Sequence, residues 1–399
     1  MLQRIATATA YDTALDNLMQ RQETLSNSQT QLTSGKRVNV ASDDPTAAAR
    51  AERARALESR TTASERAVDA STNAMTMTES ALGDANDLMQ QARDLVVQAG
   101  NASYSDAQRE AIANQIASIR SQLLGVANRP DGNGGYVFSG QGAGAAPFLD
   151  QPGGVAFVGT GGQVSAAADE QLPLTLDGGS IWLGGNTGNG VFETRNTNST
   201  GAWIDAGSVT APNQLTGSTY DVQFSVSGGT TTYSILKDGV PTSVSNAPYT
   251  SGQAITVDGM SFSITGAPAQ GDDFQIAPSQ KNLSVFDTLD RIVNQLKTPG
   301  QTGTQITQDV QASLRDIDQA SGQISSARSY AGSTLDRLDG VKGRLDATQL
   351  SAQTAQSNAE DLDMVKALSS FQNQQTGYSA ALQSYASIQK MSLFQYLNA

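Results

Sequence analysis

Two groups of carboxylates have the spacing that acid–base chemistry could use. Asp272 and Asp273 are adjacent, and Glu360, Asp361 and Asp363 follow one another within a short stretch. Glycoside hydrolases use paired carboxylates as acid and base or nucleophile. Adjacent side chains on a strand face opposite sides, however, and the second group is expected on the solvated face of a helix. We therefore expect neither group to be catalytic.

Three glycine-containing segments resemble ligand-binding loops but lack required residues. No helix opens after the segment 140–144, because Pro147 and further glycines follow. Ser34-Gly35-Lys36-Arg37 lacks both the earlier Gly and the following Ser or Thr of a phosphate loop. The segment 131–135 begins like a calcium loop, but its twelfth position is Gly142 where a Glu is needed. Each segment is expected to be a turn.

Composition excludes several classes of function. The 399 residues include no Cys and no His, which removes thiol nucleophiles, imidazole bases and zinc sites of Cys or His type. The net charge of −13 argues against nucleic acid as a partner. The N-terminal residues lack the apolar core of a signal peptide, and no run approaches the ~20 apolar residues that span a bilayer. We therefore expect that the protein is not an enzyme, that it binds no cofactor or metal, and that it does not insert into a membrane.

Glycine and charge divide the chain into three segments. Residues 131–280 hold 27 of the 38 Gly, with 12 acidic and 2 basic side chains. The flanking segments are rich in Ala, Gln, Ser and Leu. This predicts a mainly α protein with an inserted β domain: a long antiparallel helical bundle or coiled coil of both chain ends, plus a small antiparallel β domain. The expected parts are a terminal coiled coil (1–42 and 360–399, disordered in the monomer), a helical bundle (43–140 and 281–359) and an acidic, Gly-rich β domain (141–280).

Both outer segments repeat at the coiled-coil interval. From Leu57 to Ala99, seam positions recur in steps of three and four over about six heptads. Ser105 with Gln108 predicts a capping box at the start of another helix. Near Leu362 the register slips, which predicts a joint between two bundle regions. Candidate assembly contacts near the chain ends are Leu18, Leu25, Leu32, Leu368, Phe371, Tyr378, Leu382, Leu393 and Phe394.

The middle segment alternates with period two, as in Tyr220, Val222 and Phe224. The turn dipeptides Asp238-Gly239 and Asp258-Gly259 separate strands at hairpin spacing, which predicts a small antiparallel β domain. The charge excess favours a solvent-facing domain. We expect that a short linker in place of 153–277 leaves the bundle folded.

A second break between helices is expected before the long helical run. Asp44 is placed to cap that helix and Pro45 to occupy its first position. The inter-helix joint is therefore assigned to Gly35, Lys36, Arg37, Asp43, Asp44 and Pro45. Its charged residues predict a salt-bridged joint or an intersubunit contact.

Several motifs resemble one known family. Residues 32–39 followed by Ser-Asp-Asp-Pro at 42–45 resemble the N-terminal signature of the flagellin superfamily. The Lys after Gly and the Pro after Asp-Asp are closer to the hook-associated protein 3 family, the hook-filament junction proteins, than to filament flagellin. Residues 131–140, the Lys-Asn-Leu at 281–283 and the ending 391–397 are similar to the same family.

The resemblance implies a structural subunit of the bacterial flagellum that joins hook and filament and templates flagellin polymerisation. It implies extracellular placement after export through the flagellar type III apparatus, without a cleaved signal peptide. It also implies a homo-oligomeric ring, with the first hook-associated junction protein, flagellin and an export chaperone as partners. A filament flagellin of the same superfamily is the alternative, and an adhesin-like protein or a carboxylate hydrolase is more distant.

Overall fold

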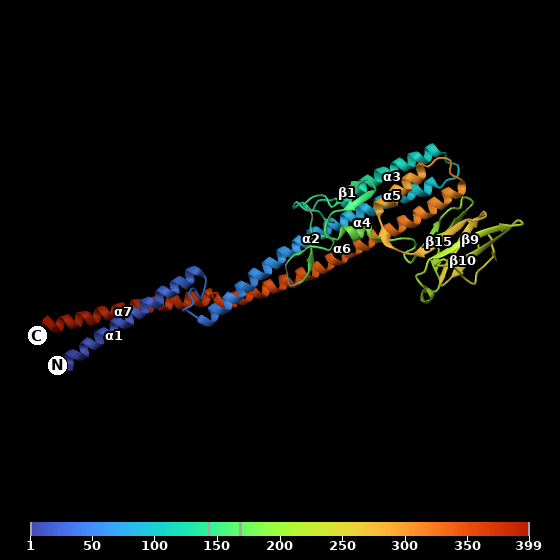
Figure 1. Cartoon of the computed structure of the whole chain (residues 1–399). Helices are drawn as coiled ribbons and strands as arrows, with labels where there is room; N and C mark the ends of the chain where they lie inside the picture. Colours follow the sequence, from blue (N-terminus) through green and yellow to red (C-terminus); the bar gives the residue numbers. More distant parts are fainter. Residues whose placement is uncertain (1, 143, 167–169, 398–399) are drawn as a thin grey trace. The chain divides into compact units, whose positions relative to one another are not determined.

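The structure is a computed structural model that describes residues 2–142, 144–166 and 170–397, with side chains from 11 to 387. Helices occupy both ends of the chain and strands occupy its middle, as the sequence predicts (Figure 1). The chain divides into two compact units, residues 1–66 with 342–399 and residues 67–341. The helices are α1 (Leu2–Ser34), α2 (Pro45–Ala99), α3 (Asp106–Ala127), α4 (Gly178–Leu183), α5 (Val285–Lys297), α6 (Gly303–Glu360) and α7 (Met364–Leu397).

In the first unit, α1 packs along α7, so the two ends of the chain lie side by side (Figure 1). Leu18 is buried in this pair, and the Ser28 hydroxyl donates to Gln374 Oε1 at 2.8 Å. The first turns of α2 bury Ala47, Ala51 and Ala54 at helical spacing. Small residues at such positions allow close approach of helices.

In the second unit, the predicted seam of α2 forms the core of the helical bundle. Its positions are buried throughout, including polar ones: Val68, Ser71, Met75, Thr78, Leu82, Ala85, Met89, Ala92, Val96 and Ala99. Helix α6 runs antiparallel to α2, and side-chain contacts join the two helices: Arg328–Glu79, Ser325–Asn86 and Asp318–Arg93. The capping box at Ser105 is confirmed. Leu57, also assigned to the same seam, lies in the first unit and is 38% exposed.

Residues 148–166 and 170–186 pack on the helices rather than in the β domain. Trp182 of α4 is fully buried and stacks on Phe286 of α5, with ring centroids 5.9 Å apart. Phe138 and Phe148 meet the same indole edge-on. These aromatic side chains anchor an otherwise glycine-rich segment, so the β domain is narrower than the expected 141–280. The short strands here are β1 (Phe148–Gln151), β2 (Gly154–Phe157), β3 (Ser165–Ala166), β4 (Leu172–Pro173) and β5 (Gly185–Asn186).

The β domain itself has two antiparallel sheets. One has the order β11-β10-β9-β15-β6, with β12 also on β10, and the other has the order β13-β14-β7, with β8 on β14. Their strands are β6 (Phe192–Asn196), β7 (Ala202–Ile204), β8 (Ser208–Val209), β9 (Tyr220–Ser227), β10 (Thr230–Lys237), β11 (Val240–Pro241), β12 (Ala247–Pro248), β13 (Ala254–Val257), β14 (Met260–Gly266) and β15 (Asp273–Pro278).

The β domain has a hydrophobic core of its own, built from both sheets and centred on Tyr220, Val222 and Phe224. The predicted hairpin turns are confirmed: Asp238 and Asp258 have positive φ, as do the glycines after them, which is the two-residue turn that matches strand twist. A 3₁₀ turn, η1 (Pro212–Gln214), lies between β8 and β9.

The acidic residues of this domain form internal contacts more than an outer acidic face. Glu193 and Asp272 are buried, and Asp258 accepts from Lys237 Nζ at 2.7 Å. The carboxylates of Asp205 and Asp221 bond neighbouring strands. The composition therefore reflects carboxylates used as local hydrogen-bond acceptors.

A paired neck connects the β domain to the bundle. The entering strand β5 pairs with the leaving strand β16 (Lys281–Leu283). The Thr187 amide donates to the Gln280 carbonyl at 2.9 Å, and the Ser279 amide donates to the Val191 carbonyl at 3.0 Å. The two ends of the domain are thus neighbours.

Two deletions test this boundary. Joining Gly190 to Ser279 through a short Gly-Ser linker removes only the domain with its own core, so the helical circular dichroism and cooperative melting of the bundle are expected to persist. Replacing 153–277 also removes Trp182, whose loss alone costs about 3–5 kcal/mol. This corrects the expectation from the sequence that the bundle would stay folded: the second variant is expected to lose cooperative melting. Equal behaviour of the two variants would contradict the boundary.

Candidate functional site

Two breaks in the helices meet at a joint in the first unit. The loop after α1 lies beside the break between α6 and α7, and their backbones bond as a short antiparallel pair. The Arg37 amide donates to the Glu360 carbonyl at 2.7 Å, and the Leu362 amide donates to the Gly35 carbonyl at 3.0 Å. Gly35 has φ +70°, which ends α1 at little conformational cost. Two backbone hydrogen bonds therefore join the loop after α1 to the break between α6 and α7.

Asp44 caps α2 and ties it to the loop. Its Oδ1 accepts from the Ala47 amide at 3.0 Å and from the Thr46 hydroxyl at 2.8 Å, while Oδ2 pairs with Arg37 at 3.1 Å. Pro45 occupies the first helical position, as predicted. Asp44 is therefore both a helix cap and an ion-pair partner.

Asp43 stabilises the loop rather than forming an ion pair. Its Oδ2 accepts from the amides of Asn39 at 2.9 Å and Val40 at 3.0 Å. The predicted cluster thus has three roles: Asp44 caps α2 and pairs with Arg37, Asp43 holds the loop, and Lys36 pairs with Glu360.

Glu360 is the buried charge at the centre of the joint. Its side chain is 5% exposed and pairs with Lys36 Nζ at 3.0 Å and with the Arg55 guanidinium. Gln356 donates to the same carboxylate at 2.7 Å, and Arg37 donates to the neighbouring Ala359 carbonyl at 2.8 Å. A carboxylate removed from water needs such partners.

The pKa values of both carboxylates follow from these contacts. The Ala47 amide, the Thr46 hydroxyl and Arg37 lower the pKa of Asp44 to about 2. Burial alone would raise the pKa of Glu360, but hydrogen bonds from Gln356 and Lys36, together with the positive charges of Arg55 and Lys36, outweigh it and leave that pKa below its usual value. Both groups therefore stabilise the joint fully above about pH 5, where unfolded carboxyls are ionised, and this stabilisation is lost as the pH falls through their lower folded-state values.

The second predicted carboxylate group is corrected by this arrangement. Glu360, Asp361 and Asp363 do not lie on the solvated face of a continuous helix, because α6 ends at Glu360 and α7 starts at Met364. Asp363 caps α7 by accepting from the Lys366 amide at 3.1 Å. The slipped register near Leu362 marked this break, but no sequence signal distinguished Glu360 or Arg55 as its buried ion pair.

The candidate assembly residues, here called the terminal seam, are only partly covered in one chain. Leu18 is buried, and Leu25, Leu32, Phe371 and Tyr378 are half-buried. Leu368 and Leu382 are 52% and 42% exposed. Leu393 and Phe394 lie in α7 beyond the described side chains.

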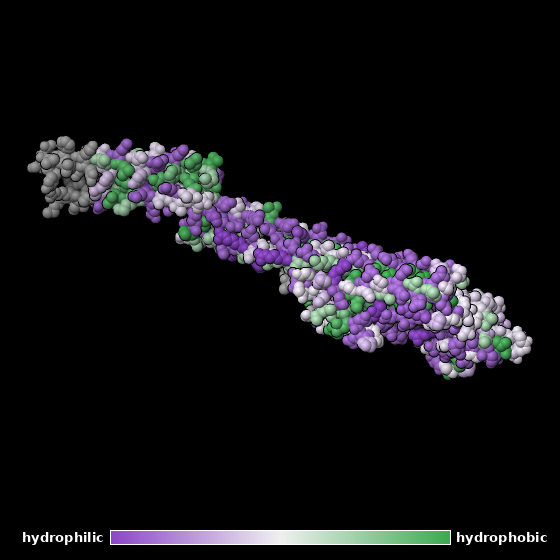
Figure 2. All heavy atoms as spheres, turned by 90° about the horizontal axis from the view of Figure 1, so that it is seen from above, coloured by the Kyte–Doolittle hydropathy of each residue, from purple (hydrophilic) through white to green (hydrophobic). Residues whose placement is uncertain are grey.

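Further apolar side chains outside the terminal seam are exposed on the same helices. They are Tyr11, Leu15, Met19, Met364 and Val365, the last at 84% exposed. Figure 2 shows apolar surface on this part of the molecule. Exposed apolar area of this kind marks an interaction surface.

The other candidate sites have structural roles. Asp272 accepts from the Ser199 hydroxyl at 2.5 Å and the Ala269 amide at 3.0 Å, which holds a turn together. Asp131 accepts from the amides of Asn133 and Gly135 in its own loop. Among the described residues, no acidic cluster has the arrangement of a metal site, and no helix is long and apolar enough to cross a membrane.

Comparison with known families matches three parts of the chain. The family model for the bacterial flagellin N-terminal helical region matches residues 5–143, and that for the C-terminal helical region matches 314–397. The D2-like domain of flagellar hook-associated protein 1 matches 191–278, the same residues as the β domain with its own core.

Solved structures decide the family. FlgL of Xanthomonas campestris is 32% identical, with a TM-score of 0.68, covering 77% of this chain and 99% of that one. The chain belongs to the FlgL family. Flagellar hook-associated protein 3 of Salmonella typhimurium is 25% identical over 98% of this chain and 99% of its own length. The corresponding protein of Legionella pneumophila is 25% identical, with a TM-score of 0.72 over 77% of this chain and 98% of that one.

FlgL-family membership makes the chain a structural protein of the flagellum and removes filament flagellin as the alternative. A FlgL structure from Legionella pneumophila, 27% identical, is described as a flagellar junction protein. In this family, the helices of both chain ends are the parts shared with flagellin.

Substitution of two glutamates that both pair with Arg55, one buried and one exposed, tests the joint. Glu360 is 5% exposed, whereas Glu52, which pairs with Arg55 at 3.2 Å, is 75% exposed. Glu360→Ala removes the buried carboxylate that Lys36 and Arg55 share and is expected to cost about 1.5–3 kcal/mol, because both cations stay partly in contact with water at 40% and 44% exposed. Glu52→Ala is expected to cost at most ~1 kcal/mol. Swimming of a strain whose only copy is the variant, with export checked by immunoblot, measures the difference.

Loss of swimming in Glu360→Ala, with Glu52→Ala at the parent level, is the expected result. Parent-level swimming of both variants at equal export would show that the buried pair does not hold the joint.

Proposed function

We propose that this FlgL-family chain is a structural, non-catalytic subunit that joins the hook to the filament and templates flagellin polymerisation. It forms a homo-oligomeric ring, with the first hook-associated junction protein on one side and flagellin on the other. It leaves the cell without a cleaved signal peptide, and an export chaperone accompanies its C-terminal helix.

One observation carries the proposal: the paired terminal helices are incomplete in a single copy. Leu368, Leu382 and Met19 are 52%, 42% and 55% exposed on α7 and α1. Complete burial of such side chains is worth roughly 1.5–3 kcal/mol each. A ring of copies, flanked by related helices of hook and filament proteins, supplies the covering surfaces that one copy lacks.

Deletion of this protein from its source bacterium tests the role. Without the junction, exported flagellin has no template, so we expect non-motile cells that release unpolymerised flagellin into the medium. Absence of flagellin from the medium, or normal filaments, would contradict the proposal. Loss of a sole flagellin, by comparison, leaves none to detect.

Complementation of that strain tests the terminal seam. Leu25→Asp places a charge at a half-buried seam position of α1, while Asn27→Asp adds the same charge two residues away at an exposed one. We expect Asn27→Asp to restore swimming and Leu25→Asp to fail although it is exported. Restoration by both variants would remove the seam from the assembly contacts.

We also propose that 1–42 and 360–399 are disordered in the free monomer and fold on assembly, when the joint of Lys36, Arg37 and Glu360 forms with them. The α1–α7 pair has polar residues at the seam positions Gln22 and Gln29, and its apolar side chains are only partly covered. Fixing each residue's backbone costs about 1–2 kcal/mol, which two weakly packed helices do not recover. Disordered ends remain threadable during export and delay polymerisation.

Limited proteolysis of a verified monomer measures this. Trimming of both ends to a resistant core that starts near 41–45 is expected. Protease-resistant termini in the monomer would contradict coupled folding and leave the junction role untouched.

A further inference from the structure

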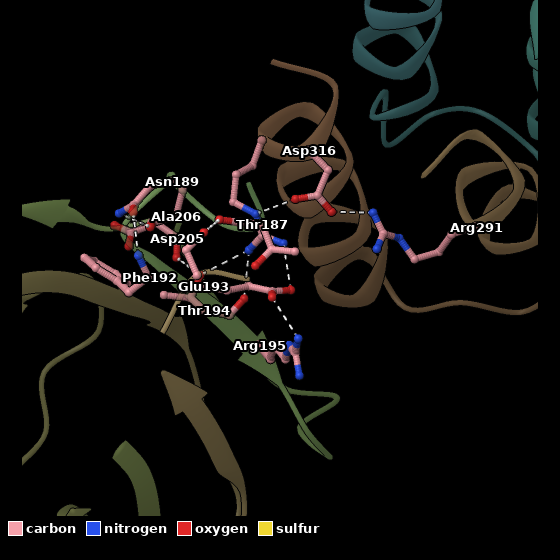
Figure 3. Close-up of polar contacts among 12 residues, drawn as sticks. Thr187, Asn189, Phe192, Glu193, Thr194, Arg195, Asp205, Ala206, Arg291 and Asp316 are labelled. Atoms are coloured by element: carbon pink, nitrogen blue, oxygen red, sulfur yellow. Dashed lines mark hydrogen bonds and ion pairs between the residues drawn. The ribbon is translucent and has the colours of Figure 1, made fainter. Parts of the chain in front are cut away.

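A chain of alternating charges links the helical bundle to the β domain within the second unit (Figure 3). From α5 to β6 it runs through Arg291, Asp316, Arg315, Glu193 and Arg195. Its middle three side chains are at most 10% exposed. Burying a charge costs free energy unless the charge is paired. These side chains are therefore stable only when the bundle and the β domain hold them in matching positions.

Arg315 occupies the centre of this chain. Its Nε donates to Asp316 Oδ1 at 2.8 Å, and one terminal nitrogen donates to the Thr194 carbonyl, also at 2.8 Å. The other terminal nitrogen lies 3.5 Å from Glu193 Oε1. The planar guanidinium therefore contacts a bundle carboxylate, a strand carbonyl and a strand carboxylate at once, which a lysine could not do.

Two other side chains at the start of α6 bond the β domain in the same manner. Gln308 Oε1 accepts from the Ile204 amide at 2.9 Å, and the Thr302 hydroxyl donates to the Thr200 carbonyl at 3.3 Å. Gln308 and Arg315 are seven residues apart and so share one face of the helix. All three contacts include backbone groups of the β domain.

These contacts lie at open sheet edges. Strand β6, which carries Thr194, ends one sheet, and strand β7, which carries Ile204, ends the other. Unpaired strand edges attract other strands. Side chains of α6 occupy positions that a further strand would take.

We propose that the start of α6 (Gln308 and Arg315, with Thr302 just before the helix) is a latch that sets the orientation of the β domain on the bundle, with Arg315 as its central positioning residue. The β domain has its own core and is joined to the bundle by the two-stranded neck. The latch therefore sets the orientation of the domain relative to the bundle and not its fold. Opening the latch leaves a folded domain that swivels on the neck and exposes the edges of β6 and β7.

Removal of Arg315 is compatible with folding. Glu193 retains Arg195 at 2.8 Å, and Asp316 retains Arg291. Neither carboxylate is left alone, so Arg315→Ala breaks the link between domains without stranding a buried charge. Arg328→Ala is a matched control, because Arg328 lies on the same helix and pairs with Glu79 of α2 at 2.7 Å, away from the β domain.

The absence of cysteine allows two spin labels to be placed cleanly. Val97→Cys on α2 of the bundle and Val240→Cys on β11 of the β domain use exposed positions, 52% and 65% exposed. Pulsed electron–electron double resonance of the full-length labelled chain then measures the distribution of distances between the label on the bundle and the label on the β domain. A narrow distribution is expected in the parent and in Arg328→Ala, and a broad one in Arg315→Ala.

Amide exchange separates a swivel from unfolding. The Ile204 amide at the latch is expected to exchange on the order of tenfold faster in Arg315→Ala, while the Val222 amide in the central strand β9 keeps its parent rate. A narrow distribution in Arg315→Ala would overturn the latch, as would equal acceleration at both amides. If Arg315→Ala fails to fold, Gln308→Ala decides: a broad distribution supports the latch and a narrow one overturns it.

Discussion

The joint depends on one buried carboxylate, that of Glu360. Because Lys36 and Arg55 both pair with it, the loop after α1, the first turns of α2 and the end of α6 have to come to one place. The backbone pair between Arg37 and Glu360 then sets where α1 stops and where α7 resumes. The two chain ends can pack along each other only because these breaks coincide.

Long helices with narrow seams explain why such a joint is needed. The bundle seam of α2 alternates large apolar residues with Ala, Ser and Thr, and nearly all of it is buried. The terminal helices lack an equivalent cover, and much of their apolar surface stays exposed. A chain built in this way is stable in its middle and open to association at its ends, which fits a subunit completed by its neighbours.

Periodicity was sufficient to predict the helices, the β hairpins and the break near Leu362, because these depend on local patterns. Asp44 and Pro45 were likewise predictable from capping chemistry. Glu360 and Arg55 were not, since their pairing joins positions 305 residues apart. The limits of the β domain were also misjudged, because Trp182 and Phe148 anchor a segment whose composition resembles that domain. The latch on α6 has no sequence signature, because its contacts with the β domain are largely to backbone groups and its carboxylate partner Glu193 is distant in the sequence.

The central claim is that other subunits cover the apolar face of the terminal helices. A high-resolution electron cryomicroscopy map of the assembled hook–filament junction tests it most directly. The account predicts that Leu368, Leu382 and Met19 lie against neighbouring subunits, with Glu360 still paired to Lys36 and Arg55. A map in which these apolar side chains face solvent in the assembled ring would contradict it.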